Sequence, residues 1–404
     1  MLFKYQAQSG TGNIIEGEAE ASDKFSLVAV MKKKNYTVIL AKEIQTQKSH
    51  LRTFFEDSIG IVRLSEKIVF IKSFGAMLKA GLSVSRSLSV LERQTKNKTF
   101  RSIINALGRD IAKGSPLHKA LGRFPKIFSS LTVAMVSAGE ESGTLPESLA
   151  IIGEHLDKSY ELQKKIRGAL IYPAIILSTM IGIGILMLTY VVPILTSTFQ
   201  ELGVPLPLST KVVIGVSSLL RDYTIFAVLF FVFIFLALLV SVRTVQGKKV
   251  LDFLFLKIPI IGALTREVNS ARTARTMSSL LTAGVTIIEA LNITKDVIQN
   301  SYYKEVLEKA KGTILRGTQL SFVFSRNEYL YPVLVAEMTA VGEETGKLPE
   351  MLLNLAIFYE NEVTQKTKDI STIIEPVLMV IIGISVGFFA ISMITPLYSV
   401  LGDI

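Results

Sequence analysis

Two nearly identical acidic stretches are the clearest candidates for chemistry in this sequence. Gly139–Glu147 reads Gly-Glu-Glu-Ser-Gly-Thr-Leu-Pro-Glu, and Gly342–Glu350 reads Gly-Glu-Glu-Thr-Gly-Lys-Leu-Pro-Glu. Paired carboxylates in a turn could bind a divalent cation or dock a partner protein. A structural interpretation competes, because glycines end helices and carboxylates favour the start of the next helix. The pattern favours the structural corner and leaves four candidates for partner docking, namely Glu140, Glu141, Glu343 and Glu344.

The second stretch superficially resembles a phosphate-binding loop but does not fit one. Such a loop has four residues between its glycines and Ser or Thr after its Lys. Here three residues separate Gly342 from Gly346, and Leu348 follows Lys347. The chain has no Cys and three scattered histidines, which argues against thiol chemistry and a catalytic triad. We predict that the chain is not an enzyme and has no cofactor or metal site, the cation alternative above aside.

The acidic stretches belong to an internal repeat with a constant offset of 203 residues. Residues 78–81 (Leu-Lys-Ala-Gly) correspond to 281–284 (Leu-Thr-Ala-Gly), and one register relates residues 66–201 to 269–404. Apolar residues at helical spacing and Gly at predicted helix ends indicate a helical bundle in each copy. Thr144 with Glu147 also fits a helix capping box.

Three stretches are long and apolar enough to cross a bilayer, which needs about 20 residues. They are residues 169–195, 223–242 and 373–397. The alternative, buried core helices, would need a globule large enough to hide all three. The first and third spans belong to the two repeats, and the second has no counterpart. It would return the chain, so that both repeated domains face the same side.

The distribution of charge predicts the orientation of the spans. Residues 1–167 contain 26 Lys and Arg against 16 Asp and Glu, which equals the whole formal net charge of +10. Basic residues also follow the second span and precede the third, so the positive-inside rule places these segments in the cytoplasm. The start of the chain lacks the pattern of a signal peptide. We therefore predict a cytoplasmic N-terminus and an external C-terminus. Nucleic-acid binding is the alternative explanation of the basic charge.

Two features of the predicted spans stand out chemically. Glu375 lies at the cytoplasmic end of the third span, where the first copy has Tyr172. It is either a functional carboxylate near membrane depth or a headgroup-level residue, solvated or paired with Lys366 or Lys368. Gly383 and Gly387 form Gly-x-x-x-Gly, a pattern that lets spans pack closely.

Together these patterns predict an all-α membrane protein with two homologous cytoplasmic helical bundles and three transmembrane helices. A small N-terminal α+β module is expected in addition, because Phe3, Tyr5 and Ala7 alternate, residues 36–40 favour a strand and residues 23–34 favour a helix. The predicted segments are the module (1–45), a linker (46–63), bundle 1 (64–168), the first span (169–195), an external loop (196–222), the second span (223–242), a cytoplasmic connector (243–270), bundle 2 (271–372), the third span (373–397) and an external tail (398–404).

Over nearly its whole length the chain resembles the type II secretion system F / type IV pilus assembly inner-membrane platform family (GspF/PilC-like). The resemblance rests on Phe3, Tyr5, Ala7, Gly17 and Ala19, on both Ala-Gly corners, on both Gly-Glu-Glu stretches, and on Tyr172-Pro173 and Glu375-Pro376. Doubled motifs at this spacing, combined with three spans, are highly specific.

This resemblance implies a homo-oligomeric platform in the bacterial inner membrane. Its cytoplasmic domains would contact a hexameric assembly ATPase, and its membrane part would pass pilin or pseudopilin subunits into a growing filament. Other inner-membrane assembly proteins and the lipid bilayer are further expected partners, and direct nucleic-acid binding is not expected. The candidates for the pilin path are Tyr172, Pro173, Glu375, Pro376, Gly383 and Gly387. A transporter is the rival class, and few polar residues inside only three spans argue against it.

Overall fold

The computed structural model describes residues 2–9, 14–20, 36–43, 62–201, 206–223, 244–259 and 261–402. It also describes a few isolated residues, namely Val28, Lys32, Leu229, Phe233, Ile234, Leu236, Ala237 and Val240. Contacts divide the chain into two units. One unit is Met1–Val62 with Asn97–Phe100, and the other is the remainder of the chain.

The N-terminal unit contains a three-stranded antiparallel sheet. Strand β1 (Leu2–Ser9) lies between β2 (Ile14–Glu20) and β3 (Tyr36–Glu43), and its register with β3 shifts between Gln6 and Ala7. The alternation at the start of the chain therefore does form a strand. The helix predicted for residues 23–34 lies outside the described residues, apart from Val28 and Lys32, which are helical.

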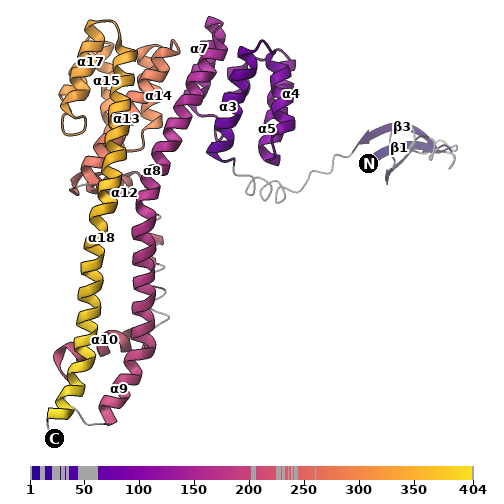
Figure 1. The fold of residues 1–404 in the computed structure, drawn as a ribbon. Coiled ribbons are helices and arrows are strands. Elements are labelled where there is room, and N and C mark those ends of the chain that lie inside the picture. Colours follow the sequence, from indigo (N-terminus) through magenta and orange to yellow (C-terminus); the bar gives the residue numbers. More distant parts are fainter. Residues whose placement is uncertain are drawn as a thin grey trace. The chain divides into compact units, whose positions relative to one another are not determined.

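The second unit is helical and contains the repeat as two sets of helices (Figure 1). The first set is α3 (Leu64–Lys79), α4 (Val84–Gln94), α5 (Lys98–Ala112), α6 (Leu117–Gly122), α7 (Ser130–Ser142) and α8 (Leu145–Leu186). The second set is α13 (Ile261–Thr282), α14 (Ile287–Val297), α15 (Ser301–Ile314), α16 (Leu320–Ser325), α17 (Val333–Glu344) and α18 (Leu348–Gly402). From α4 and α14 onward, the paired helices begin 203 residues apart. The predicted repeat is thus a repeat of structure.

Glycines with left-handed backbone conformation mark the same three turns in both sets. The pairs are Gly81 and Gly284 (φ 88° and 86°), Gly114 and Gly317 (85° and 82°), and Gly143 and Gly346 (73° and 70°). Side chains other than that of Gly are strained in this region. These turns therefore explain why Gly occurs at equal offsets.

The two bundles have different aromatic cores. In the first, the Phe70 ring lies 5.8 Å from that of Phe74 and 5.9 Å from that of Phe128. In the second, the rings of Tyr303 and Tyr331 meet edge to face at 4.9 Å, and both tyrosines are fully buried. The Tyr303 hydroxyl donates to the carbonyl oxygen of Leu330, so its burial leaves no unpaired donor.

The longest helices extend from the bundles through the first and third predicted spans. Helix α8 continues through a π-helical turn, η1 (Met187–Val191), into α9 (Val192–Glu201), which gives a run of 57 residues. Leu348–Pro396 of α18 forms the second long run, and the most apolar windows of the two runs are only 6% and 17% buried. Helices this apolar and this exposed are candidate membrane spans and not the core of a globule.

The two spans run side by side in the same direction (Figure 1). Leu162 packs with Val363 nearer the bundles, and Val192 packs with Met393 near the far end. The second predicted span, residues 223–242, lies largely outside the described residues. Its described members from Leu229 to Val240 are helical and exposed.

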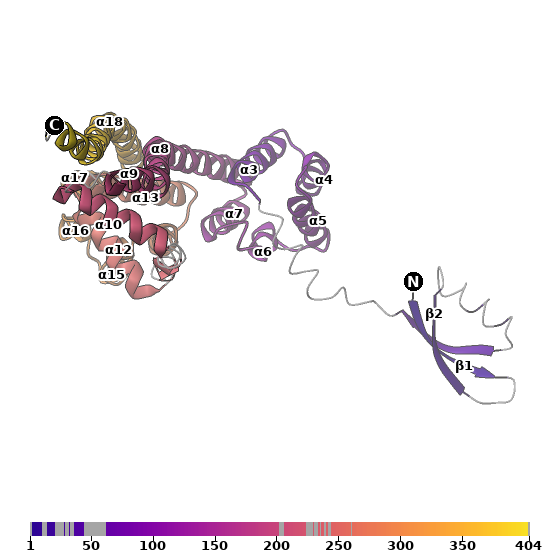
Figure 2. The ribbon, with the colours of Figure 1, turned by 90° about the horizontal axis from the view of Figure 1, so that it is seen from below.

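The segment predicted as an external loop, residues 196–222, contains the end of α9 and a further helix, α10 (Leu208–Asp222). This helix packs against α9 and α18, and Figure 2 shows α9 and α10 from the far end of the spans. Thr210 and Ser217 lie on its buried face, seven residues apart. Their hydroxyls donate to backbone carbonyls of Ser392 and Leu188, respectively.

Prolines explain why those two carbonyls are free to accept. Pro396 has no N–H to donate to Ser392, four residues before it. In η1 the backbone hydrogen bonds span five residues, because the Val192 N–H donates to the carbonyl oxygen of Met187. The same spacing pairs the carbonyl of Leu188 with residue 193, which is a proline and has no N–H to donate. Helix α10 thus satisfies one proline-freed carbonyl in each repeat, where an unpaired group would be costly within a membrane.

The remaining helix, α12 (Val245–Lys257), packs against α13 and α15. It lies in the segment 243–270, for which the sequence predicted a connector. Helix α13 begins within the same segment, at Ile261.

Candidate functional site

The Gly-Glu-Glu stretches form corners in which two helices come unusually close. A Cβ atom on Gly139 would lie 2.5 Å from Ser148 Oγ, and one on Gly342 would lie 2.9 Å from the Cα atom of Leu348. Only Gly allows α7 to approach α8, and α17 to approach α18, at this distance. The capping box predicted at Thr144 is wrong, because this side chain makes no cap bond and its hydroxyl lies 2.7 Å from Ser142 Oγ.

The first carboxylate of each pair is used inside the bundle. Glu140 accepts hydrogen bonds from the backbone N–H groups of Leu117 (2.6 Å) and His118 (2.9 Å), and it contacts His118 Nδ1 at 2.6 Å. Glu343 accepts from the N–H groups of Leu320 (2.6 Å) and Ser321 (3.1 Å), and from the Ser321 hydroxyl. Both carboxylates therefore cap the N-terminus of a short helix, α6 or α16.

The second carboxylate of each pair points outward. Glu141 and Glu344 are exposed, and the one hydrogen bond described for either is from the Ser137 hydroxyl to Glu141. Among the described residues, no group of three His, Cys, Asp or Glu side chains is placed to hold a metal ion. The structure thus divides each predicted docking pair into a structural member, Glu140 or Glu343, and an accessible member, Glu141 or Glu344.

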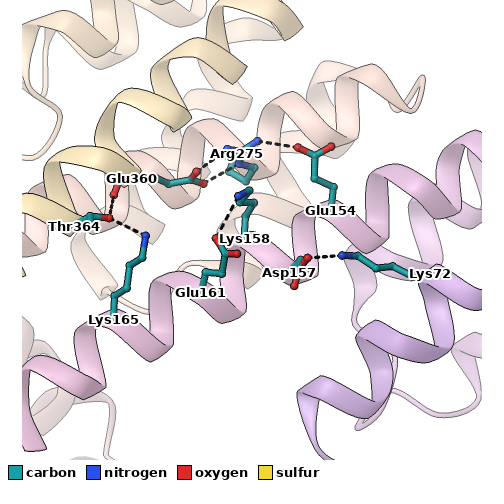
Figure 3. Close-up of polar contacts among 9 residues, drawn as sticks. All are labelled: Lys72, Glu154, Asp157, Lys158, Glu161, Lys165, Arg275, Glu360 and Thr364. Atoms are coloured by element: carbon teal, nitrogen blue, oxygen red, sulfur yellow. Dashed lines mark hydrogen bonds and ion pairs between the residues drawn. The ribbon is translucent and has the colours of Figure 1, made fainter.

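An ion pair between the first and last helices recurs in both repeats (Figure 3). Lys72 of α3 pairs with Asp157 of α8, and 203 residues later Arg275 of α13 pairs with Glu360 of α18. The first pair is exposed. The second is bidentate, with Arg275 Nε and Nη2 at 2.8 and 2.6 Å from the two carboxylate oxygens, and it is largely buried.

The second pair is buried because α8 of the first repeat packs over it. Arg275 Nη1 lies 3.9 Å from Glu154 Oε1, and the buried His155 places Nδ1 3.3 Å from Ser279 Oγ. The Ser279 hydroxyl hydrogen is directed to the Arg275 carbonyl oxygen. His155 Nδ1 and Ser279 Oγ lie within hydrogen-bond distance, and a tautomer with hydrogen on Nδ1 would donate to Ser279.

Burial keeps His155 uncharged. Desolvation, together with the positive charge of Arg275, lowers the pKa of His155 to about 4. A neutral imidazole between a guanidinium and a hydroxyl lets α8 close over α13 without a second buried positive charge. Lys165 extends the contact along α8 by donating to Thr364 of α18 at 3.1 Å (Figure 3).

The candidates in the spans are mostly exposed. Glu375 is exposed and makes no ion pair with a described residue, and Lys366 pairs with Glu267 instead. A Cβ atom on Gly383 or Gly387 would meet no atom within 4 Å. The two glycines therefore do not serve close packing against the part of the chain that the structure describes. The remaining candidates divide, with Tyr172 and Pro376 exposed and Pro173 buried.

Residues 70–193 and 273–396 each match the family described as Type II secretion system (T2SS), protein F. The two matches begin 203 residues apart, and this is the same offset that relates the helices and the glycines. Together the matches cover more than half of the chain. The chain belongs to the type II secretion system protein F family. Its predicted family and its predicted repeat are both confirmed.

Full-length relatives support this membership in the protein F family. A type IV pilus assembly protein PilC of Thermus thermophilus is 36% identical over 405 residues, covering 100% of this chain and 99% of the relative. PilC of Myxococcus xanthus is 29% identical over 402 residues, covering 100% and 95%. A type II secretion system protein F of Xanthomonas campestris pv. campestris is 29% identical, covering 98% of each chain. The chain is a platform protein of the pilus and secretion class, and such proteins are non-enzymatic assembly components.

Reasoning from this protein F sequence missed the ion pairs and His155. The three histidines were considered only as catalytic or metal-binding groups, so a buried neutral histidine between repeats was not considered. The repeat offset could have revealed the ion pairs, because Lys72 and Arg275, like Asp157 and Glu360, are like charges 203 residues apart.

We predict that Glu343→Ala destabilises the platform protein and that Glu344→Ala does not. The first change removes a carboxylate that accepts two N–H groups and a hydroxyl at α16, which is expected to cost about 2 kcal/mol. The second removes an exposed carboxylate, expected to cost less than about 0.5 kcal/mol. Thermal unfolding of the detergent-purified proteins measures both, and equal losses would contradict the assignment.

We also predict that His155 makes the protein lose stability on acidification. Its lowered pKa means that the unfolded chain binds a proton below about pH 6.5, while the folded chain does so only near pH 4. Its contribution to stability is therefore full above pH 6.5 and falls by about 2 kcal/mol between pH 7 and pH 5. The free energy of unfolding of wild type and of His155→Gln, measured at pH 7 and at pH 5, checks this prediction. Between these pH values the variant should lose about 2 kcal/mol less stability than wild type. Identical pH dependence of the two proteins would rule out His155 as the cause.

Proposed function

We propose that this protein is the inner-membrane platform of a type IV pilus or type II secretion machine, and that it couples a cytoplasmic assembly ATPase to insertion of pilin subunits. The observation that carries the proposal is full-length similarity to PilC and protein F relatives, combined with two bundles of one design. The exposed carboxylates Glu141 and Glu344 occupy equivalent corners of those bundles. They offer a motor two similar acidic contacts.

The proposed arrangement in the membrane has three spans, with the N-terminus in the cytoplasm and the C-terminus outside. The parallel direction of α8 and α18 supports it, because two parallel spans need a third segment that returns the chain. Residues 223–242 contain no charged residue, are apolar apart from Thr224 and Ser241, and lie between them in sequence. With the bundles inside, α10 would lie at the outer end of the spans.

The proposed pilin path follows the exposed face of α18. Glu375 is an exposed carboxylate on a span and makes no ion pair with the described residues, and a Cβ atom on Gly383 or Gly387 would meet no described atom within 4 Å. A carboxylate within a span is costly unless it meets a polar partner. A transmembrane pilin segment with a positively charged group, fitting against the small glycines, would supply such a partner.

Co-purification with the assembly ATPase tests the motor contact. We expect Glu141→Lys with Glu344→Lys to release the ATPase from the platform solubilised in detergent, because both reversals place like charge against a basic docking surface. Glu328→Lys, an exposed reversal away from the corners, should retain binding. Retention by the double variant would make the corners purely structural. Absence of binding by wild type would count against the platform proposal itself.

Filament assembly tests the pilin path. Glu375→Ala is expected to lower the amount of surface filament while protein level and membrane insertion stay normal, because the membrane-facing carboxylate is lost. Val377→Ala, two residues away and so on the opposite side of α18 but also exposed, is the matched control and should assemble normally. Wild-type filament levels with Glu375→Ala would remove this residue from the path.

A further inference from the structure

The contact between the two repeats joins different faces, as in a head-to-tail assembly. The first repeat contributes the face of α8 that carries Glu154 and His155. The second repeat contributes the face formed by α13 and the start of α18, with Arg275 (Figure 3) and also Ser279. We call the first the inserting face and the second the receiving face. Because the faces differ, this contact is heterologous, and among the described residues each repeat uses one of its two faces.

The unused inserting face lies on α18 and carries apolar side chains at the two positions equivalent to Glu154 and His155. Ile357 and Phe358 stand 203 residues after Glu154 and His155, and they are 44% and 45% exposed. Both lie on the bundle side of the predicted third span, in the part of α18 that packs with α13. Contiguous exposed apolar side chains are a feature of interaction surfaces.

The unused receiving face lies on α3 and has also become less polar. Val69 replaces Arg272, Lys72 replaces Arg275 and Ala76 replaces Ser279. Val69 is 64% exposed, and Lys72 and Ala76 are exposed as well. At these positions the internal contact uses imidazole, hydroxyl and carboxylate and the open faces offer apolar groups, while Lys72 stays paired with Asp157. The internal contact also has an apolar part, in which Leu162 of α8 packs with Val268 and Val363, and the residue equivalent to Leu162 on α18 is Gln365.

We propose that a second copy of this chain occupies these faces, with Ile357 and Phe358 of one copy packing on Val69 and Ala76 of the next. The proposal rests on the self-association that belongs to the proposed function, and it specifies the surface. It commits to a copy of this chain because, in the part of the chain that the structure describes, the partner bound to a face of this design is the other repeat. Apolar groups on both sides would bury area that favours association.

Membrane geometry agrees with repetition of the contact. Within one chain the contact leaves α8 and α18 parallel, with both bundles at the same end of the spans (Figure 1). If each further copy is related to its neighbour as the second repeat is related to the first, all the spans of the assembly stay parallel. A heterologous contact repeated in this way closes into a ring, or forms an open chain if the rotation does not close.

Cysteine cross-linking tests the proposal directly, because the natural chain has no Cys. Ala76→Cys and Phe358→Cys occupy the positions of Ser279 and His155, whose side chains lie 3.3 Å apart in the internal contact. We expect two differently tagged copies, one with each substitution, to be joined in membranes by a short thiol-specific cross-linker. Each single variant alone should yield little product, and a chain with both substitutions should yield a ladder of multimers.

Two control pairs calibrate the cross-linking. His155→Cys with Ser279→Cys should cross-link within one chain, which sets the efficiency at this geometry. Arg109→Cys, exposed on α5, paired with Phe358→Cys reports random collisions. The proposal is overturned if Ala76 and Phe358 cross-link no better than the Arg109 pair. It is also overturned if Phe358→Cys cross-links mainly with itself, since that would show a two-fold contact.

The mass of the purified protein in detergent separates this proposal from the proposed function. A wild-type oligomer that Ile357→Asp with Phe358→Asp converts to smaller species supports the surface. An oligomer that persists unchanged in this variant overturns the surface, while self-association and the platform function stand. A monomeric wild type that still binds the ATPase overturns both the surface and self-association, and it leaves the motor contact intact.

Discussion

The close approach of helices at Gly139 and Gly342 is the constraint on which each repeat depends. Any side chain there would collide with the start of the following long helix. Because the helices meet so closely, the carboxylate one residue later reaches back to cap α6 or α16. One glycine and one carboxylate therefore link three helices. They also fix the direction in which α8 and α18 leave their bundles, and so the direction in which the spans enter the membrane.

The repeat places the same kind of ion pair in two environments, one exposed to water and one buried. The two ion pairs have different roles because one of them is buried. Lys72 and Asp157 lie in contact with water, where such a pair contributes at most about 1 kcal/mol. Arg275 and Glu360 lie under α8, where the attraction is largely offset by desolvation. The buried pair instead specifies the docking of α8, because losing one partner would leave a charge buried and unpaired. A neutral His155 completes this site, and a second positive charge there would oppose it.

Features that repeat along the chain could be predicted from the sequence, and features that join distant segments could not. The offset of 203, the positive-φ glycines and the two described spans follow from composition and spacing. The roles of Glu140 and Glu343 did not, because each carboxylate caps a helix 23 residues earlier in the chain. The hydroxyls of α10 were missed for the same reason. Pro193 and Pro396 show which carbonyls lack a donor but not that α10 supplies it.

The contact between the two repeats of one chain and the proposed contact between two copies differ in polarity, and the difference follows from how the partners are held together. Within one chain the repeats are tethered, so the effective concentration of one face near the other is high, and a contact that includes His155 and Ser279 beside the apolar cluster of Leu162 stays closed at modest affinity. Between chains that advantage is absent, and association carries a cost in translational and rotational freedom. Apolar burial must then supply more of the free energy. The exchange of His155 for Phe358 and of Ser279 for Ala76 is the change expected when one contact serves first within a chain and then between chains.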